Sequence, residues 1–169
     1  VARLAPILNK AGSNLRIGII WSGSTTFKAN HNRAVKLDRF VRAFAVPGVQ
    51  LFSLQKGPPE AELKASPNAA IIDLAPHLRD FADTAAAVSQ LDLVIMTDSA
   101  VAHLAGAMGK PVWVLLHHVP FWLWLTDRED SPWYPSMRLF RPKAWDDWNS
   151  VFDAAAASLP PRSAMSPPC

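Results

Sequence analysis

Continuous apolar stretches are the feature that most constrains how this 169-residue chain can fold. They span residues 16–22, 49–55, 69–75, 92–98 and 111–117, with a shorter one at 137–141. Runs of this kind, in place of an in-and-out alternation, are typical of strands that are buried on both faces. Segments with helical spacing separate them. This order predicts a doubly wound, Rossmann-like α/β domain, with a parallel sheet of about six strands covered by helices on both sides.

The intervening helices are expected at 39–46, 59–66, 81–91, 100–109 and 145–159. Acidic and hydroxyl residues precede several of them, as is usual at helix N-termini. Asp38 is the expected N-cap of the first, either Asp80 or Asp83 of the third, and Ser99 of the fourth.

Composition sets the domain organisation. The chain is 50% hydrophobic, which is enough apolar material for one core. We expect residues 1–15 to form an N-terminal extension or linker, 16–159 the folded domain, and the Pro- and Ser-rich segment 160–169 a disordered tail. Because the chain begins without methionine, we also expect it to be part of a longer protein.

Charge, hydropathy and cysteine content bear on the partners and the location of the chain. The net charge of +3 comes from scattered basic residues, whereas nucleic-acid binding usually needs a dense basic stripe. The most apolar region, 111–125, contains two histidines and a proline, so we expect no membrane span. The single cysteine, Cys169, excludes an internal disulfide and favours a reducing, cytoplasmic location.

Polar residues follow the ends of the expected strands, where parallel α/β sheets bind their ligands. They are Ser22-Gly23, Gln55-Lys56-Gly57, Asp73, Thr97-Asp98-Ser99 and His117-His118. If the strands are parallel, these groups lie along one edge of the sheet.

The segment Asp98-Ser99-Ala100-Val101-Ala102-His103 is the most informative of these strand ends. A helix N-terminus presents free backbone N–H groups and attracts phosphate. Ala100 leaves room for close approach, and His103 lies one helical turn beyond Ser99. Two interpretations remain open: Ser99 and His103 contact an anionic ligand, or Ser99 only caps the helix while His103 packs in the core.

The loop 23–36 follows the first strand and carries Gly23, Lys28, His31 and Arg33. Lys28 and Arg33 are candidates to hold phosphate groups, and Lys56 is another at the second strand end; a solvated surface is the alternative. The loop lacks both the dinucleotide-binding fingerprint and the P-loop pattern.

Other chemistries have weaker support. Adjacent residues of an extended chain point in opposite directions, so His117 and His118 make a poor pair of metal ligands. No zinc-type spacing and no nucleophile elbow is present, and we expect no metal and no cofactor. Tryptophans are concentrated at 122–148, where they either pack a long loop against the sheet or form a cradle for a sugar or base.

Several stretches together resemble a known family. They are GIIWSG…NRAVKL, FSLQKGP, DFADTAAAVSQLDLVIMTDSAVAHLAGAMGKPVWVLL and DSPWYPSMRLFR. Over roughly residues 16–159 they are similar to the C-terminal glycosyltransferase-like domain of bacterial tetratricopeptide-repeat proteins, which resembles the lipopolysaccharide heptosyltransferases of glycosyltransferase family 9.

The resemblance implies the C-terminal half of a two-domain, metal-independent GT-B glycosyltransferase that binds a nucleotide-sugar donor. It implies donor contacts for Asp98, Ser99, Ala100 and His103, where Ala100 replaces the family's glycine. Arg33, Lys28 and Lys56 would be further donor-facing residues.

The same resemblance implies that the catalytic base belongs to a missing N-terminal domain, so that the isolated chain binds the donor and transfers little sugar. That domain, or tetratricopeptide repeats of the same protein, would be its partner. The alternatives are a non-catalytic protein-interaction module of the same fold and half of a sugar-nucleotide epimerase.

Overall fold

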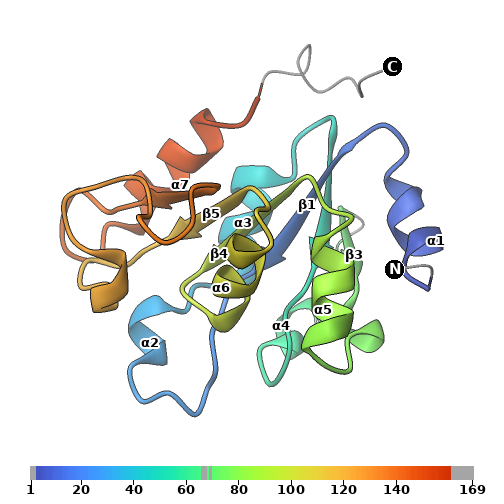
Figure 1. The fold of residues 1–169 in the computed structure, drawn as a ribbon, viewed down its shortest axis with the longest axis horizontal. Coiled ribbons are helices and arrows are strands. Elements are labelled where there is room, and N and C mark those ends of the chain that lie inside the picture. The colour runs from blue at the N-terminus through green and yellow to red at the C-terminus, as the bar shows by residue number, and fades with distance from the viewer. Residues whose placement is uncertain (1–2, 66–67, 69, 161–169) are drawn as a thin grey trace.

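The computed structural model describes residues 3–65, 68 and 70–160, and its centre is a six-stranded sheet in which every pairing is parallel. The strands are β1 (Leu15–Ile20), β2 (Val49–Ser53), β3 (Ile71–Asp73), β4 (Leu93–Thr97), β5 (Val112–Leu115) and β6 (Met137–Phe140). Their order is β3-β2-β1-β4-β5-β6 (Figure 1). The predicted doubly wound, Rossmann-like architecture is thereby confirmed.

Helices cover both faces of the sheet (Figure 1). One face packs against α1 (Ala5–Leu8), α5 (Phe81–Val88) and α6 (Ala100–Ala107), and the other against α3 (Leu37–Phe44), α4 (Glu60–Ala65) and α7 (Trp148–Ala157). The remaining elements are short: α2 (Asn30–Arg33) and the 3₁₀ turns η1 (Asn9–Ala11), η2 (Ala75–His77) and η3 (Trp122–Trp124).

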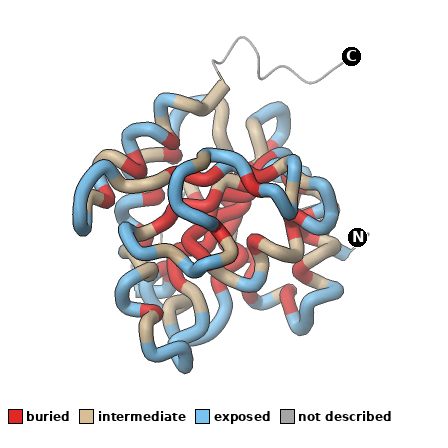
Figure 2. Tube along the Cα trace, turned by 60° about the vertical axis from the view of Figure 1, so that its left-hand side comes forward, coloured by how far each residue is buried: buried red, intermediate tan, exposed pale blue. Residues whose placement is uncertain are grey.

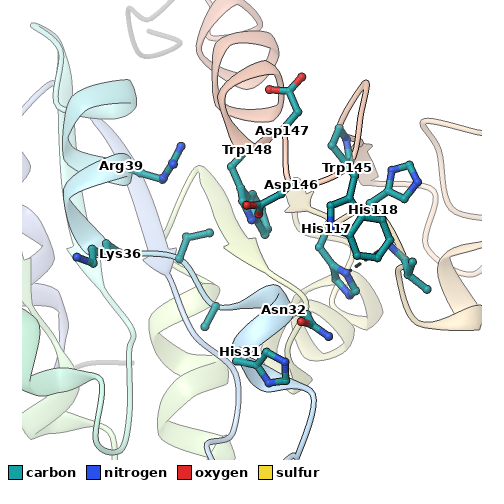
Figure 3. Close-up of a pocket in the computed structure, with 14 residues that line it drawn as sticks. His31, Asn32, Lys36, Arg39, His117, His118, Trp145, Asp146, Asp147 and Trp148 are labelled. Carbon is teal, nitrogen blue, oxygen red and sulfur yellow. Dashed lines mark hydrogen bonds between the residues drawn. The ribbon is translucent and has the colours of Figure 1, made fainter.

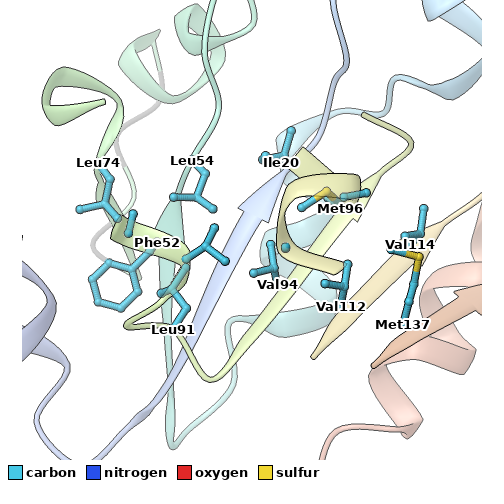
Figure 4. Packing of buried hydrophobic residues seen from close by; sticks show 14 of the residues in the cluster. Ile20, Phe52, Leu54, Leu74, Leu91, Val94, Met96, Val112, Val114 and Met137 are labelled. Atoms are coloured by element: carbon cyan, nitrogen blue, oxygen red, sulfur yellow. The ribbon is translucent and has the colours of Figure 1, made fainter. Parts of the chain in front are cut away.

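Successive residues of the central strands belong to opposite layers, which explains why those strands are apolar throughout. In β1, Ile17 and Ile19 belong to the α3–α7 layer, whereas Ile20 belongs to the α5–α6 layer. Figure 4 shows the α5–α6 layer. In Figure 2 the buried residues of both layers concentrate at the centre of the molecule. At Gly18 the side chain of Leu91 packs directly against the strand, since a Cβ there would lie 2.6 Å from Cδ1 of Leu91 and would displace it.

The N-terminal segment differs from the expected extension or linker. Leu4, Leu8 and Ala11 are buried, with exposed fractions of 1%, 0% and 3%, and join the α5–α6 layer. Residue 16 therefore does not mark the start of the packed core, because α1 and η1 supply apolar side chains to it. The predicted tail at 160–169 lies outside the described residues, apart from residue 160.

Two local expectations are also corrected. Lys36, and not Asp38, is the N-cap residue of α3; Asp38 lies in the first turn and pairs with Arg42 at 2.7 Å. Part of the expected loop 23–36 forms α2. For α5 the structure selects Asp80, whose carboxylate accepts a hydrogen bond from Asp83 N at 2.8 Å.

No helix in the described part of the chain is long and apolar enough to cross a membrane.

Replacing Leu8 by alanine tests whether α1 belongs to the folded unit. Because Leu8 is completely buried, the change should lower the free energy of unfolding by about 2–5 kcal/mol. Denaturant unfolding followed by circular dichroism measures this, with the exposed Lys10→Ala as the control. An effect equal to that of the control would show that α1 contributes nothing to stability.

Candidate functional site

The strand order reverses between β1 and β4, and a cavity of about 510 Å³ opens beside this point at the carboxyl edge of the sheet. We call it the central groove. Its walls come from the ends of β1 and β2, the start of α5 and the start of α6. Residues 20, 22–25, 54–59, 78–81, 84 and 99–101 line it. Of the residues predicted from the sequence, the groove brings together Gly23, Lys56, Ser99 and Ala100.

The N-terminus of α6 opens into the central groove without a side-chain cap. Ser99 is the N-cap residue, but its hydroxyl makes no capping hydrogen bond and instead donates to Sδ of Met96 at 3.5 Å. Ala100 is exposed. At the neighbouring helix α5, by contrast, Asp80 occupies the equivalent position with its carboxylate. The α6 end is therefore the better place for an external anion.

Gln55 holds the ends of β1 and β2 together beneath the central groove. Its Oε1 accepts hydrogen bonds from Trp21 N at 3.1 Å and Ser22 N at 2.9 Å, and its Nε2 donates to Ser22 O at 3.1 Å. The side chain is buried, with 2% exposed. Sequence reasoning placed Gln55 at a strand end and missed this role; a long amide at the end of an apolar run was the available signal.

Lys56 lies at the groove with its ammonium group partly engaged. Its Nζ donates to Ala75 O at 2.9 Å and lies 3.8 Å from a carboxylate oxygen of Glu60. Burial raises the pKa of Glu60, but the hydrogen bond from Gly57 N–H and the nearby lysine ammonium groups outweigh it and hold that pKa below its usual value. About half of the Lys56 side chain, 52%, remains exposed, so it can reach a ligand.

Arg33 and Asp98 form an ion pair across the reversal point. Nη1 of Arg33 lies 3.3 Å from Oδ2 of Asp98, and both side chains are largely buried, with 15% and 6% exposed. The guanidinium also stacks over the Phe27 ring at 4.3 Å. A Cβ at Gly23 would lie 2.9 Å from Nη2 of Arg33, so a larger residue there would displace the guanidinium from this position.

The structure does not bring all the predicted residues into the central groove. Arg33 and Asp98 lie beside it as the ion pair, outside its described lining. Lys28 is exposed on the 23–36 loop, and its carbonyl oxygen lies 3.1 Å from Nδ1 of His31. Donor contacts for these residues stay predictions.

His103 packs in an aromatic cluster with Trp124 and Tyr134, outside the described lining of the central groove. Its ring stacks on Trp124 with centroids 4.9 Å apart, and its Nδ1 lies 3.2 Å from the hydroxyl of Tyr134. A Cβ at Gly106 would lie 2.6 Å from Cγ of Tyr134, so this glycine allows the tyrosine to approach α6. The contacts are those of the packed-histidine interpretation; a ligand contact by His103 is a prediction that they do not test.

A second cavity, also about 510 Å³, lies at the same edge beyond β5 (Figure 3). We call it the lateral cleft; residues 31–32, 34–36, 39, 117–119, 142 and 145–148 line it. His117 and His118 both belong to the lining, with His118 beside Trp145 (Figure 3). Burial lowers the pKa of the His117 imidazole, while Asp98 opposes this shift and the charges of Arg33 and His118 add to it.

Within the described ranges, no group of three or more His, Cys, Asp or Glu side chains is placed to hold a metal ion.

Comparison with known proteins connects this architecture to a family. The model of glycosyltransferase family 9 (heptosyltransferase) matches residues 48–116. The crystal structure of a family 9 glycosyl transferase from Veillonella parvula matches with a TM-score of 0.59 and 14% identity, covering 97% of this chain and 48% of that one. Protein FlbA of Caulobacter vibrioides is 33% identical over 170 residues, covering 94% of this chain and 27% of FlbA.

The all-parallel six-stranded sheet with helices on both faces defines the class as a Rossmann-like α/β domain. Within that class, the family model and the shared fold confirm the expected resemblance to a glycosyltransferase family 9 domain. The chain spans about a quarter of FlbA and about half of the Veillonella protein.

The Arg33–Asp98 pair should be coupled energetically. Asp98→Asn leaves a largely buried guanidinium without its counter-charge and should lower the free energy of unfolding by about 1–3 kcal/mol, the cost of a buried group that loses its hydrogen-bond partner. Arg33→Met combined with Asp98→Asn should cost less than the sum of the two single changes. Urea unfolding of the four proteins of this cycle measures the coupling, and strictly additive effects would contradict it.

His117 should make stability depend on pH. Its pKa in the folded state lies below the ordinary value of 6.5, so the unfolded chain binds more protons as the pH falls through this range. The free energy of unfolding should therefore decrease from about pH 7 downward until the folded pKa is passed, and His117→Gln should flatten this part of the curve.

Urea unfolding between about pH 7.5 and pH 5 measures the effect of this change. The exposed His31→Gln is the matched control for loss of an imidazole from the same cleft, because His31 is not among the groups that shift the pKa of His117. If the free energy of unfolding of His117→Gln depends on pH as steeply as that of the wild-type protein, other groups cause the pH dependence.

Proposed function

We propose that this chain is the donor-binding domain of a glycosyltransferase and that a nucleotide sugar occupies the central groove. The observation that carries the proposal is the N-terminus of α6, which opens into the groove without a cap from Ser99. The similarity of residues 48–116 to glycosyltransferase family 9 supports a sugar-transfer role for it.

The diphosphate is assigned to the α6 N-terminus. Backbone N–H groups at Ala100 and Val101 point out of the first turn, and the helix dipole favours negative charge there. Ala100 adds only a methyl group to an exposed position, which leaves room for a phosphate. Lys56 reaches the groove from the opposite wall with a positive charge.

The base is assigned to the apolar end of the groove. Phe81 is 60% exposed although it is a large aromatic residue, and it lines the groove together with Pro58, Pro59 and Leu78. Each of the nucleobases can stack on such a ring, because each has a π-face, and one stacking contact contributes about 1–3 kcal/mol. This arrangement would bind several bases and leaves the choice among them to contacts at the base edge.

In sugar transfer, this chain would stabilise the negative charge that develops on the departing nucleotide. Fixed N–H dipoles and lysine charge act on that oxygen without the need for a metal ion. The base that activates the acceptor is assigned to a part of the protein beyond this chain, such as an N-terminal domain. We therefore propose that the isolated chain binds donor and transfers little sugar.

The remaining features of the full protein are part of the same proposal. The chain covers 27% of FlbA, so there is room for further domains in proteins of that length, and tetratricopeptide repeats are the partner that the sequence resemblance implies. A cytoplasmic location follows from the lone cysteine and the proposed donor.

A charge change at the α6 N-terminus tests the proposal. Ala100→Glu places a carboxylate where the phosphate is expected and is compatible with the helix dipole, so the fold should be kept. Binding of nucleoside diphosphates, measured by calorimetry with a panel of bases, should weaken about tenfold or more, equivalent to ~1.4 kcal/mol.

Ala100→Gln is the matched neutral control and should weaken binding much less. Phe81→Ala should weaken every nucleotide of the panel by a similar factor, because stacking does not depend on the base. If no nucleotide binds the wild-type chain at about millimolar concentration, the donor-site proposal is wrong.

A second candidate function is a protein-interaction module, which the exposed aromatic residues favour. Trp122 is 68% exposed and Trp133 54% exposed, although Trp124 between them is fully buried. A loop that served only to pack on the sheet would bury all of these indoles. If the Trp122→Ala and Trp133→Ala variants still bind a protein partner of the wild-type chain, the interaction-module function is excluded. If they lose the partner but still bind nucleotide, one domain has both functions.

A further inference from the structure

The lateral cleft has a chemistry that the proposed nucleotide does not use. It lies at the carboxyl edge of the same sheet, and its volume of about 510 Å³ is within the range of small-molecule sites. The Arg33–Asp98 pair lies between the ends of β1 and β4, and His117 of the cleft interacts electrostatically with both of its members. The cleft is therefore adjacent to the reversal point on which the central groove also depends.

An exposed indole forms one wall of the lateral cleft. Trp145 is 74% exposed, the largest exposed fraction among the described apolar side chains that are exposed. Its ring centroid lies 5.2 Å from that of His118 with an interplanar angle of 57° (Figure 3), so the two rings are in contact while most of the indole stays exposed. Trp148, which is buried, provides a second indole at the base of the wall.

Polar groups surround this aromatic wall. His31 belongs to the segment between β1 and α3 and Asp146 to the turn before α7, whereas Lys36 lies at the far side of the cleft from Trp145 (Figure 3). Arg39 is fixed on the same side by a hydrogen bond from Nη1 to Oδ1 of Asn149 at 2.8 Å. The cleft therefore combines a flat apolar surface with hydrogen-bond donors and acceptors of both charges.

We infer that the lateral cleft binds a pyranose sugar, with one face of the ring against Trp145 and the hydroxyl groups on the surrounding polar side chains. A pyranose presents a C–H face and an equatorial belt of hydroxyls, which matches an indole rimmed by imidazole, ammonium and carboxylate groups. A purely anionic ligand fits less well, because the carboxylates of Asp146 and Asp147 offset the positive charges of Lys36 and Arg39 in the same lining.

The sugar has two possible sources. It is either the sugar carried by the donor nucleotide or a sugar of the acceptor. The first source rests on the proposed function, since it requires a nucleotide in the central groove; the second does not.

Trp145→Ala is the test variant, and Trp122→Ala is the matched control, since both indoles are highly exposed and Trp122 is not part of the described cleft lining. The exposure of Trp145 predicts that its loss leaves the fold intact, which circular dichroism checks. Binding is measured by calorimetry and by saturation-transfer NMR with three sets of probes: nucleoside diphosphates, the corresponding nucleotide sugars, and methyl pyranosides with short glycans.

A donor sugar in the cleft predicts that nucleotide sugars bind up to about tenfold more tightly than the parent diphosphates, and that only Trp145→Ala removes this difference. An acceptor sugar predicts that glycosides bind without nucleotide and that Trp145→Ala abolishes their NMR signal. Either result supports the inference and identifies the source.

The inference is overturned if no probe shows a sugar-dependent signal, or if Trp145→Ala and Trp122→Ala behave alike. Its failure is distinguishable from that of the proposed function, because binding of the diphosphates alone reports on the central groove. If glycosides bind and no nucleotide does, the sugar site in the lateral cleft is supported and the donor site in the central groove is excluded.

Discussion

The position of β1 between β2 and β4 is the constraint on which the rest of the structure depends. A strand with neighbours on both sides and helices on both faces must be apolar along its whole length, and Gly18 lets Leu91 approach its backbone. Because the chain leaves β1 towards β2 in one direction and later returns to β4 in the other, the loops after β1 and β4 separate and a cavity opens between the elements that follow. Gln55 fixes the β1–β2 side of that point, and the Arg33–Asp98 pair fixes the β1–β4 side.

The two cavities at this edge have different chemistries although their volumes are similar. The central groove combines an uncapped helix N-terminus with Phe81 and prolines, which suits a phosphate at one end and a flat apolar group at the other. The lateral cleft combines an exposed indole with imidazoles and charges of both signs. Ligand parts joined in one molecule, or two molecules that react, would occupy neighbouring positions on the same rigid sheet edge. A transferase needs such an arrangement, because the reacting groups must be held close together.

Much of the fold could be predicted from the sequence, whereas the site could be predicted only in part. The long apolar runs identified every strand, and small differences at their ends have little effect on the topology. Gly23, Lys56, Ser99 and Ala100 were placed correctly at one edge because strand ends are visible in the sequence. The packing of His103 against Trp124 and Tyr134, the bonds of Gln55 and the burial of Leu8 were not visible, because each depends on residues distant in sequence.

The sequence alone determined the parallel α/β class and the residues that its strands deliver to the carboxyl edge, because hydrophobic periodicity and strand ends are local properties of the chain. Only the tertiary structure decided which of those residues share a cavity. It paired Arg33 with Asp98 and packed the His103 ring within an aromatic cluster. It also left the N-terminus of α6 without a side-chain cap, whereas Asp80 caps that of α5. The physical reason is that charge pairing, stacking and capping act over a few ångströms, and the distances between side chains are set by packing and not by their spacing in the sequence.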